Sequence, residues 1–232
     1  LYILDAKAND NTNGSKQEIT NNYVSPVIAG SNPIIAWSGG SSANVLDRSA
    51  PFTTLGAPVF SAQAGSPTGA WMAIDANGEG LRRTVGTDLN LGTGNWTLSW
   101  WMSVASEAAG NRIYIYIADG TDTDIIRIHV NAASSDGLVL WLSDDGLATV
   151  DELIAMTNVD DGVLRFYSYM RDGNTLRVYI NGIQVGTTSV VSAAASIDPT
   201  IIDIGVGLNV TSDTFAGLTF VKTALSVQQI QD

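Results

Sequence analysis

The clearest pattern of apolar and polar positions in the chain lies between residues 162 and 186. Three runs rich in β-branched and aromatic residues, 163–171, 175–180 and 183–186, are separated by two short polar turns. The turns contain Asp172-Gly173-Asn174 and Asn181-Gly182, and Asn-Gly is the preferred dipeptide of a two-residue type I′ hairpin. The pattern therefore predicts a three-stranded antiparallel meander.

The register of this meander depends on the length of its first turn. A three-residue loop at 172–174 would pair Met170 with Leu176, Ser168 with Val178 and Phe166 with Ile180, which makes an apolar face because side chains alternate along a strand. The opposite face would then carry Arg165, Tyr167, Tyr169, Arg171, Arg177 and Tyr179. A loop that is one residue shorter would change these faces, so the three-residue register is the preferred prediction and the shorter loop is its alternative.

A second strong alternation occurs at residues 96–104. One face carries Trp96, Leu98, Trp100, Met102 and Val104, and the other carries Thr97, Ser99 and Ser103, with Trp101 interrupting the polar side. Further short strands are predicted at 34–37, 70–75, 81–85, 112–118, 124–130, 137–143, 149–156, 200–205 and 214–222, with a long loop following the first. Ser226 and Gln229 fit a capping box that opens one helical turn. Short strands at this spacing predict an all-β protein, a two-sheet antiparallel β-sandwich.

Three stretches, in order along the chain, carry a resemblance to a known family. They are TDLNLGTGNWTLSWWM at 87–102, RDGNTLRVYING at 171–182, and FAGLTF at 215–220 followed by ALS at 224–226. Together they resemble laminin-G-like (LamG) domains of the concanavalin A-like lectin/glucanase superfamily, over about residues 34–232. The resemblance implies a concanavalin A-like jelly roll. The chain departs from the family pattern at residues 164–166, where the family often has Trp-His-His, and at Asn181-Gly182, where it has Asp-Gly.

Composition narrows the class of partner. The formal net charge is −12, from 11 basic and 23 acidic residues. Phosphate backbones and anionic membranes are bound by clustered Lys and Arg, so no nucleic-acid partner and no membrane insertion are expected. There is no cysteine, which excludes disulfides and thiolate metal sites; because animal LamG domains usually carry a disulfide, a microbial or viral relative is expected.

The N-terminal residues 1–33 differ from the predicted domain at 34–232. They are rich in Asn and poor in apolar side chains, so they are predicted to form an arm that makes assembly contacts or remains loosely packed. The chain begins at Leu1 without an initiator methionine or signal peptide, as expected of a processed chain or a fragment.

Catalytic chemistry finds little support in the sequence. Glycoside hydrolysis needs two carboxylates held roughly 5–9.5 Å apart, and the sandwich glucanases place two Glu on one strand. Here the four glutamates, Glu18, Glu79, Glu107 and Glu152, are far apart in sequence. The single histidine, His129, is predicted to be a packed or half-exposed strand residue. We therefore expect a protein that is not an enzyme.

Two sets of residues are candidates for binding. Asp119, Asp122 and Asp124 place three carboxylates in one turn, a set of hard oxygen ligands that Ca²⁺ prefers, although a solvated acidic turn is the alternative. Sugars stack on aromatic rings with polar groups alongside, and the predicted ligand-binding residues are Tyr167, Tyr169, Tyr179, Arg165, Arg177 and Trp101. Core packing of these aromatic residues is the alternative.

The sequence thus predicts a non-enzymatic binding module that acts through its surface. The leading hypothesis is an extracellular structural protein of a virion, such as a phage tail or capsid appendage, or of a microbial cell surface. Such a protein would contact a glycan or a protein partner as a homo-oligomer or as part of a larger assembly. The alternative is a free carbohydrate-binding module of a secreted polysaccharide-degrading system, and a degenerate hydrolase is a third hypothesis.

Overall fold

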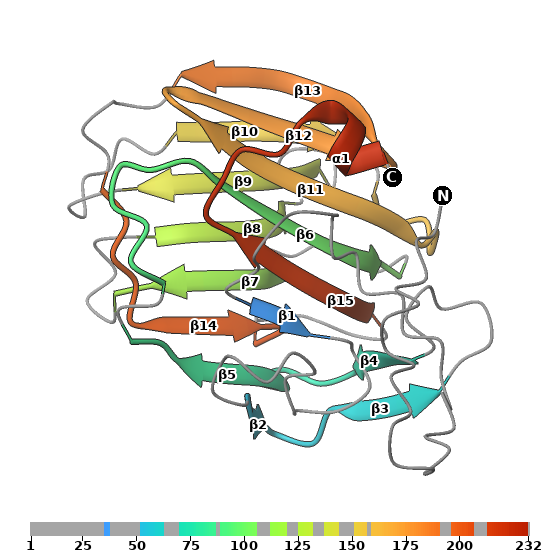
Figure 1. The fold of residues 1–232 in the computed structure, drawn as a ribbon. Helices are drawn as coiled ribbons and strands as arrows, with labels where there is room; N and C mark the ends of the chain where they lie inside the picture. Colours follow the sequence, from blue (N-terminus) through green and yellow to red (C-terminus); the bar gives the residue numbers. More distant parts are fainter. Residues whose placement is uncertain are drawn as a thin grey trace, which may run out of the picture.

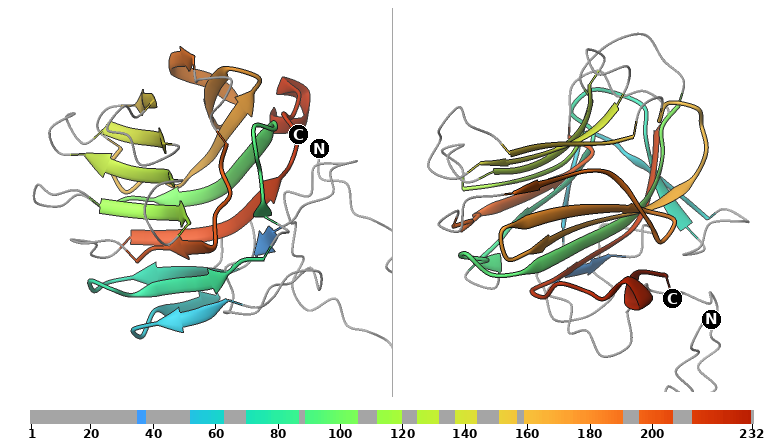
Figure 2. Two further views of the ribbon diagram at one scale, coloured as in Figure 1. Left: turned by 90° about the vertical axis from the view of Figure 1, so that its left-hand side faces the viewer. Right: turned by 90° about the horizontal axis from the view of Figure 1, so that it is seen from above.

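The computed structural model describes eleven stretches of the chain. They are residues 35–37, 52–62, 70–86, 89–105, 112–119, 125–131, 137–143, 151–156, 159–190, 196–206 and 213–231. Within them the chain forms fifteen β-strands and one short helix, arranged as two antiparallel sheets packed face to face (Figures 1 and 2). The predicted all-β, two-sheet sandwich is confirmed, whereas the predicted arm at 1–33 lies outside the described residues.

The first sheet, called sheet A here, lies in front in Figure 1. Its order is β13 (Ile183–Val190), β12 (Thr175–Ile180), β11 (Arg165–Asp172), β6 (Trp96–Ser103), β15 (Asp213–Val221), β4 (Ala70–Ile74) and β3 (Val59–Ala62). The short strand β1 (Ile35–Trp37) pairs with the second half of β15. Strands far apart in sequence are therefore neighbours, and β6 lies between β11 and β15 at the centre of the sheet.

The second sheet, sheet B, lies behind sheet A. Its order is β10 (Asp151–Met156), β9 (Gly137–Ser143), β8 (Ile125–Asn131), β7 (Arg112–Ala118), β14 (Ile201–Ile204), β5 (Gly80–Thr84) and β2 (Thr53–Leu55). The sequence pattern placed most of these strands to within a residue or two. It missed β2 and β3, which are short strands at sheet edges and lie inside the stretch predicted as a long loop.

The core lies between the sheets and contains the predicted apolar face of β6. The indole of Trp100 stacks with Tyr167 at 5.5 Å, with Tyr169 at 5.3 Å and with Phe215 at 6.4 Å between ring centroids. Trp96 meets Phe220 edge to face at 5.9 Å. The five side chains predicted to point inward are all fully buried: Trp96, Leu98, Trp100, Met102 and, just after the strand, Val104. Burying aromatic rings of this size accounts for a large share of the hydrophobic stabilisation.

The register predicted for the meander is wrong, because its first turn has two residues and not three. Tyr167 pairs with Ile180, Tyr169 with Val178 and Arg171 with Leu176. This shift by one position moves the predicted solvent-facing residues of β11 onto the core side, as is general for strands. The second turn is as predicted: Asn181 and Gly182 have φ angles of 51° and 77°, which a type I′ turn requires.

The helix α1 (Val227–Gln231) covers part of the outer face of sheet A (Figure 1). Its capping box is confirmed: the Gln229 amide N–H donates to Ser226 Oγ at 3.2 Å, and the Ser226 amide N–H donates to Gln229 Oε1 at 2.9 Å. Beneath it lies a second apolar cluster, made of Met170, Tyr179, Val221, Leu225 and Ile230. This part of the outer face is therefore closed by the chain itself.

Candidate binding faces

A row of side chains crosses the outer face of sheet A, perpendicular to its strands. Phe166 on β11 pairs with Trp101 on β6, and Trp101 pairs with Ala216 on β15. The pair Phe215–Met72 places Ala216 next to Trp71 on β4, and Trp71 pairs with Ser61 on β3. The turn residue Asn181 lies beside Phe166 at the other end. We call Asn181, Phe166, Trp101, Ala216, Trp71 and Ser61 the tryptophan row.

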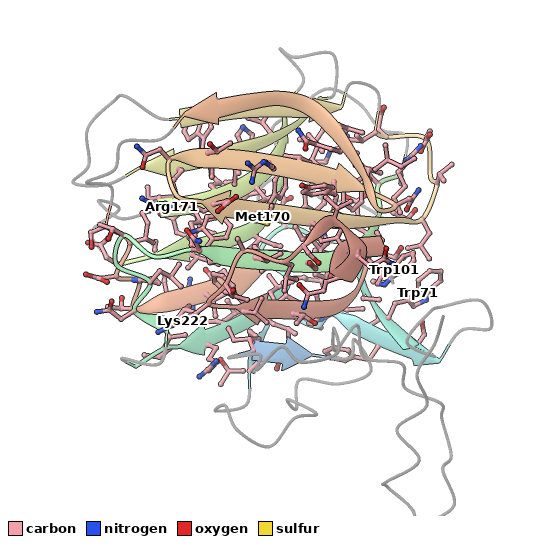
Figure 3. The ribbon with its side chains drawn as sticks, turned by 45° about the horizontal axis from the view of Figure 1, so that its top comes forward. Trp71, Trp101, Met170, Arg171 and Lys222 are labelled. Atoms are coloured by element: carbon pink, nitrogen blue, oxygen red, sulfur yellow. The ribbon has the colours of Figure 1, made fainter. Side chains whose placement is uncertain are left out.

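The aromatic side chains of this row point away from the core. Trp101 lies between the buried Trp100 and Met102, and Trp71 precedes the buried Met72, so alternation directs both indoles outward. Both indoles are half-exposed. The Trp101 and Phe166 rings contact one another at 5.2 Å with an interplanar angle of 43°. Figure 3 shows Trp71 and Trp101 near one another at the same end of the molecule, away from Met170 and Lys222.

Polar groups lie at both ends of the tryptophan row. Asn181 is exposed, and its Oδ1 accepts a hydrogen bond from the Phe166 amide N–H at 2.9 Å, while its own amide N–H donates to the Phe166 carbonyl at 2.8 Å. With Oδ1 engaged, the two N–H groups of Nδ2 remain as outward donors. Ser61 places a hydroxyl at the opposite end.

Three of the predicted ligand-binding residues are tyrosines, and the structure buries all of them. Tyr167 and Tyr169 have no exposed surface, and Tyr179 is 2% exposed in the cluster beneath α1. Burial raises the pKa of Tyr167 to about 12 and the pKa of Tyr169 well above its usual range. The predicted surface of three tyrosines is therefore wrong. The register shift turned Tyr167 and Tyr169 toward the core, whereas Tyr179 lies on the outer face and is covered by α1 and its apolar cluster.

The two predicted arginines are held in ion pairs. Arg165 donates from Nη1 and Nη2 to the Asp161 carboxylate at 2.8 and 2.5 Å, and Arg177 Nη1 donates to Asp172 Oδ2 at 2.6 Å. The guanidinium of Arg165 lowers the pKa of Asp161 to about 2. Trp101 is the predicted residue that lies in a half-exposed aromatic row.

The outer face of sheet B carries a second row of neighbouring side chains, most of them aromatic or charged. Its members face one another on adjacent strands from β9 to β2 and are Trp141, Arg127, Tyr116, Asp203, Arg82 and Thr53. We call this set the charged row. Unlike the tryptophan row, it alternates aromatic, basic and acidic groups.

The groups of the charged row are engaged with one another. The Arg127 guanidinium carbon lies 3.4 Å from the centroid of the Trp141 ring, and the His129 ring meets Trp141 edge-on at 5.3 Å. Arg82 donates from Nε and Nη2 to the Asp203 carboxylate at 2.7 and 2.6 Å, which raises the pKa of Arg82. Such bidentate and cation–π contacts engage the aromatic and charged groups of this face with one another.

His129 is packed in this face, as one of the two predictions for it stated. It is 2% exposed and pairs with Val139 on β9 and Ile113 on β7. Burial, with a smaller contribution from the positive charge of Arg127, lowers the pKa of His129 to about 4. The side chain is therefore a neutral packing residue near neutral pH.

Residues 62–231 match the family described as the concanavalin A-like lectin/glucanases superfamily. The chain belongs to this family. No curated protein sequence gives a significant match. The sequence-based recognition of a LamG-like chain of the concanavalin A-like superfamily is thereby confirmed.

Solved structures show the same fold at low sequence identity. The binding domain of botulinum neurotoxin serotype G superposes with a TM-score of 0.70 at 10% identity, covering 86% of this chain and 50% of that one. The binding domain of Paraclostridial Mosquitocidal Protein 1 gives 0.70 at 12%, covering 86% and 51%. The chain thus spans about half the length of these toxin binding domains.

One further similar structure is close to this chain in length. Domain 4 of AbnA, an extracellular GH43 arabinanase of Geobacillus stearothermophilus, was solved in complex with arabinotriose. It gives a TM-score of 0.63 at 17% identity, covering 87% of this chain and 98% of that one. At these identities the likenesses establish the fold of this concanavalin A-like chain.

Among the described residues, no group of three His, Cys, Asp or Glu side chains could hold a metal ion. Asp119 follows β7 directly, but Asp122 and Asp124 lie outside the described residues, so the calcium site stays a prediction. Glu79 is committed to a turn, where its Oε2 accepts from the amides of Asp75 and Ala76 at 3.2 and 3.1 Å. In the described part of the chain, no helix has both the length and the apolarity needed to cross a membrane.

The sequence carried a local signal for some of the residues that were missed and none for others. Trp71 could have been found, because it alternates with Met72 and Ile74 in a strand that was predicted. Phe166 was assigned to the apolar face by the register error. The charged row had no local signal, since its members come from six strands whose pairing order is set by tertiary structure.

Proposed function

We propose that this chain is a non-catalytic carbohydrate-binding module and that the tryptophan row is its binding face. The observation that carries this proposal is the placement of two half-exposed indoles, Trp71 and Trp101, in one cross-strand row on an outer sheet face. The ring of Phe166 extends the row, and Asn181 and Ser61 add polar groups at its ends.

The chemistry of sugars explains the choice of this face. The apolar side of a sugar ring covers an aromatic ring, while its hydroxyls need hydrogen-bond partners beside that ring. The tryptophan row supplies both kinds of group on a rigid sheet. Because the strands hold the rings in place before binding, little conformational entropy is lost when a ligand stacks on them.

The similar structures support a binding role without specifying the ligand. Two are binding domains of protein toxins, and the third is a domain of an extracellular arabinanase bound to arabinotriose. We extend to this chain only the general role of a non-catalytic module with a glycan or protein partner. An extracellular location is part of the same proposal.

The biological setting stays a prediction from the sequence. A virion or cell-surface protein would use this face for attachment, and a free module would use it to hold a polysaccharide near a catalytic partner. Self-association, which the first setting predicts, distinguishes the two and is measured by light scattering of the full chain.

The proposal is tested by glycan binding with matched tryptophan variants. The full chain is screened on an array of soluble polysaccharides and oligosaccharides, and hits are measured by isothermal titration calorimetry. Trp101→Ala and Trp71→Ala are each expected to weaken binding by about tenfold or more, since loss of one stacking ring is worth about 1.4 kcal/mol or more. Trp141→Ala, on the opposite sheet, is expected to bind normally.

Two results would overturn the proposal. One is binding that survives in Trp71→Ala and Trp101→Ala but is lost in Trp141→Ala, which would move the site to the charged row. The other is the absence of any glycan hit together with capture of a protein partner through the same tryptophans. Circular dichroism of each variant separates lost binding from lost folding.

A further inference from the structure

The arrangement of the tryptophan row also restricts the kind of glycan, and this inference rests on the proposed function. We infer that the row binds an internal stretch of a linear, uncharged oligosaccharide chain, which lies across the strands, with Asn181 donating a hydrogen bond at one end. Neither the family nor the similar structures assign a ligand class or this residue to the chain.

The length of the row excludes a monosaccharide as the full ligand. From β11 to β3 the row crosses five neighbouring strands, or about 19 Å at the usual strand spacing. Trp101 and Trp71 are separated by β15 and so lie about 10 Å apart. One sugar ring cannot stack on both indoles, whereas linked sugars can reach from one to the other. The ligand must therefore be an oligosaccharide whose long axis crosses the strands.

The residue between the two indoles fits this course. Ala216 is fully buried and its methyl group is the smallest side chain in the row. A large side chain at this position would interrupt a ligand that passes from Trp101 to Trp71. Because the alanine methyl group is fully buried, it offers the ligand no exposed surface, and the indoles on either side carry the contact.

The ends of the row favour recognition within a glycan chain, not at its terminus. In the described part of the chain, one end is Ser61 on β3, the edge strand of sheet A, and the other is Asn181 in an exposed turn. Both side chains are small and polar. A glycan can therefore extend beyond each end and still form hydrogen bonds there.

Asn181 is suited to a directional contact. Its backbone is held at φ 51° by the turn, and its Oδ1 is held by the Phe166 amide N–H. The remaining polar group is Nδ2, a donor, next to the Phe166 ring. A sugar hydroxyl or ring oxygen stacked near Phe166 can accept from it.

Charge disfavours an acidic polysaccharide. The chain carries a formal net charge of −12. Arg165 at the start of β11 and Arg177 within β12 are paired with Asp161 and Asp172. A carboxylated or sulfated glycan would meet long-range repulsion, and the described residues place no unpaired cation in the row to offset it.

The inference is tested by titrating the full chain with a length series and a charge pair. The probes are the oligosaccharides of an uncharged hit from the array, from the monosaccharide to the hexasaccharide, and a polysaccharide pair that differs only in carboxylation. Affinity is expected to rise at least about tenfold from the shortest to the longest probe and then to level off. Capping both ends of the longest probe with a bulky tag should not change its affinity. The carboxylated polymer is expected to bind at least about tenfold more weakly at low salt.

The role of Asn181 is tested by a matched pair of substitutions. Asn181→Asp keeps the Oδ1 acceptor and the turn, but replaces the donor by a charge, and is expected to lose about tenfold in affinity. Asn174→Asp adds the same charge to the other exposed turn of β12 and is expected to bind as the wild type does.

The possible failures are distinguishable. Equal affinity for the monosaccharide, preference for the carboxylated polymer, or normal binding by Asn181→Asp each overturns this inference. If Trp101→Ala still abolishes binding in that case, the proposed function stands. If no glycan binds at all, both proposals are overturned.

Discussion

The two outer faces of the sandwich carry similar residues but differ in how those residues are engaged. On sheet B, Trp141 lies against the Arg127 guanidinium at 3.4 Å and against the edge of His129. On sheet A, Trp101 contacts only another aromatic ring, Phe166, among the ring contacts of the described residues, and Trp71 lies beside the small Ala216. An aromatic side chain on a sheet is thus available to a ligand only where no neighbour already occupies its ring.

The two rows also differ in the free energy that a ligand must overcome to reach their aromatic rings. A cation–π contact contributes about 0.5–2 kcal/mol to the folded state, and a ligand that displaced Arg127 from Trp141 would first have to recover that amount. Stacking on Trp71 or Trp101 removes water from apolar ring surface and displaces none of the ion pairs formed by the described residues. The charged row is therefore expected to stabilise the fold and the tryptophan row to bind, and each prediction below tests one side of this division.

The largest effect on stability is expected from Trp100→Ala, which removes an indole from the core between the two sheets. This indole is fully buried and stacks on three aromatic rings, so its loss should lower the free energy of unfolding by about 3–5 kcal/mol. Trp101→Ala is the matched control, because the neighbouring indole on the same strand points outward and should cost about 1 kcal/mol or less. Urea denaturation of both variants measures the difference. Similar losses in the two would contradict the assignment of faces on β6.

The next effect concerns pH and distinguishes the two faces directly. His129 has a pKa of about 4 in the folded chain and an ordinary value of 6.5. Between these values the unfolded chain binds more protons than the folded chain, so stability falls as the pH drops from about 6.5 to 4. The loss is expected to be about 3 kcal/mol at pH 4. Urea denaturation at intervals over this range measures it.

The control for this prediction is His129→Gln, which has no titrating group. Its stability should vary less over the same pH range than that of the wild type. Glycan binding, by contrast, should not follow the titration of His129, since the residue lies on the other sheet from the tryptophan row. An unchanged pH profile of stability in the variant would show that His129 titrates normally in the folded chain.

Much of the fold could be predicted from local pattern, because strands and tight turns are determined by residues that are close together in the sequence. The alternation from Trp96 to Val104, the Asn181-Gly182 turn and the capping box at Ser226 are all confirmed. Each depends on residues within a few positions of one another. Edge strands such as β2 and β3 were missed because they are short and carry little periodicity.

The candidate site was harder to predict, because it depends on register and pairing order. A difference of one residue in the turn at 172–174 exchanged the two faces of β11, so Tyr167 and Tyr169 became core and Phe166 became surface. The conspicuous alternation of Tyr and Arg was a property of the core side. No local sequence pattern predicts that β6, β15 and β4 are adjacent strands. Trp71 and Trp101 lie near one another only because of that strand order.

A smaller effect is expected from Trp141→Ala, which tests the stabilising role of the charged row. Loss of the cation–π contact with Arg127 and of the edge contact with His129 should lower the free energy of unfolding by about 1–2 kcal/mol. Trp101→Ala should show the reverse combination, with a small change in stability and a large loss of glycan binding. The comparison uses the same two assays on both variants. If Trp141→Ala is as stable as the wild type, the charged row does not have the structural role assigned to it.

The smallest effect is expected at Thr97, which tests whether the outer face of sheet A works as two independent parts. The Thr97 hydroxyl donates to the Thr223 carbonyl at 2.8 Å and accepts from the Leu225 amide N–H at 3.2 Å, so it holds the segment that leads into α1. Thr97→Val removes both bonds and leaves two backbone groups unpaired, at a cost of about 1 kcal/mol.

Because the loss is local, hydrogen exchange should accelerate at residues 225–230, while binding at the tryptophan row stays unchanged. Thr214→Val is the matched control on the same face, since the buried Thr214 hydroxyl has no hydrogen-bond partner among the described residues and its removal should be neutral or slightly stabilising. Unaltered exchange in Thr97→Val would show that the apolar contacts of Leu225 and Ile230 hold α1 by themselves. A loss of glycan affinity in the same variant would show instead that the helix and the tryptophan row are coupled across Ser99 and Ser168. These two side chains lie between them on β6 and β11 and are joined by a buried hydrogen bond of 2.8 Å.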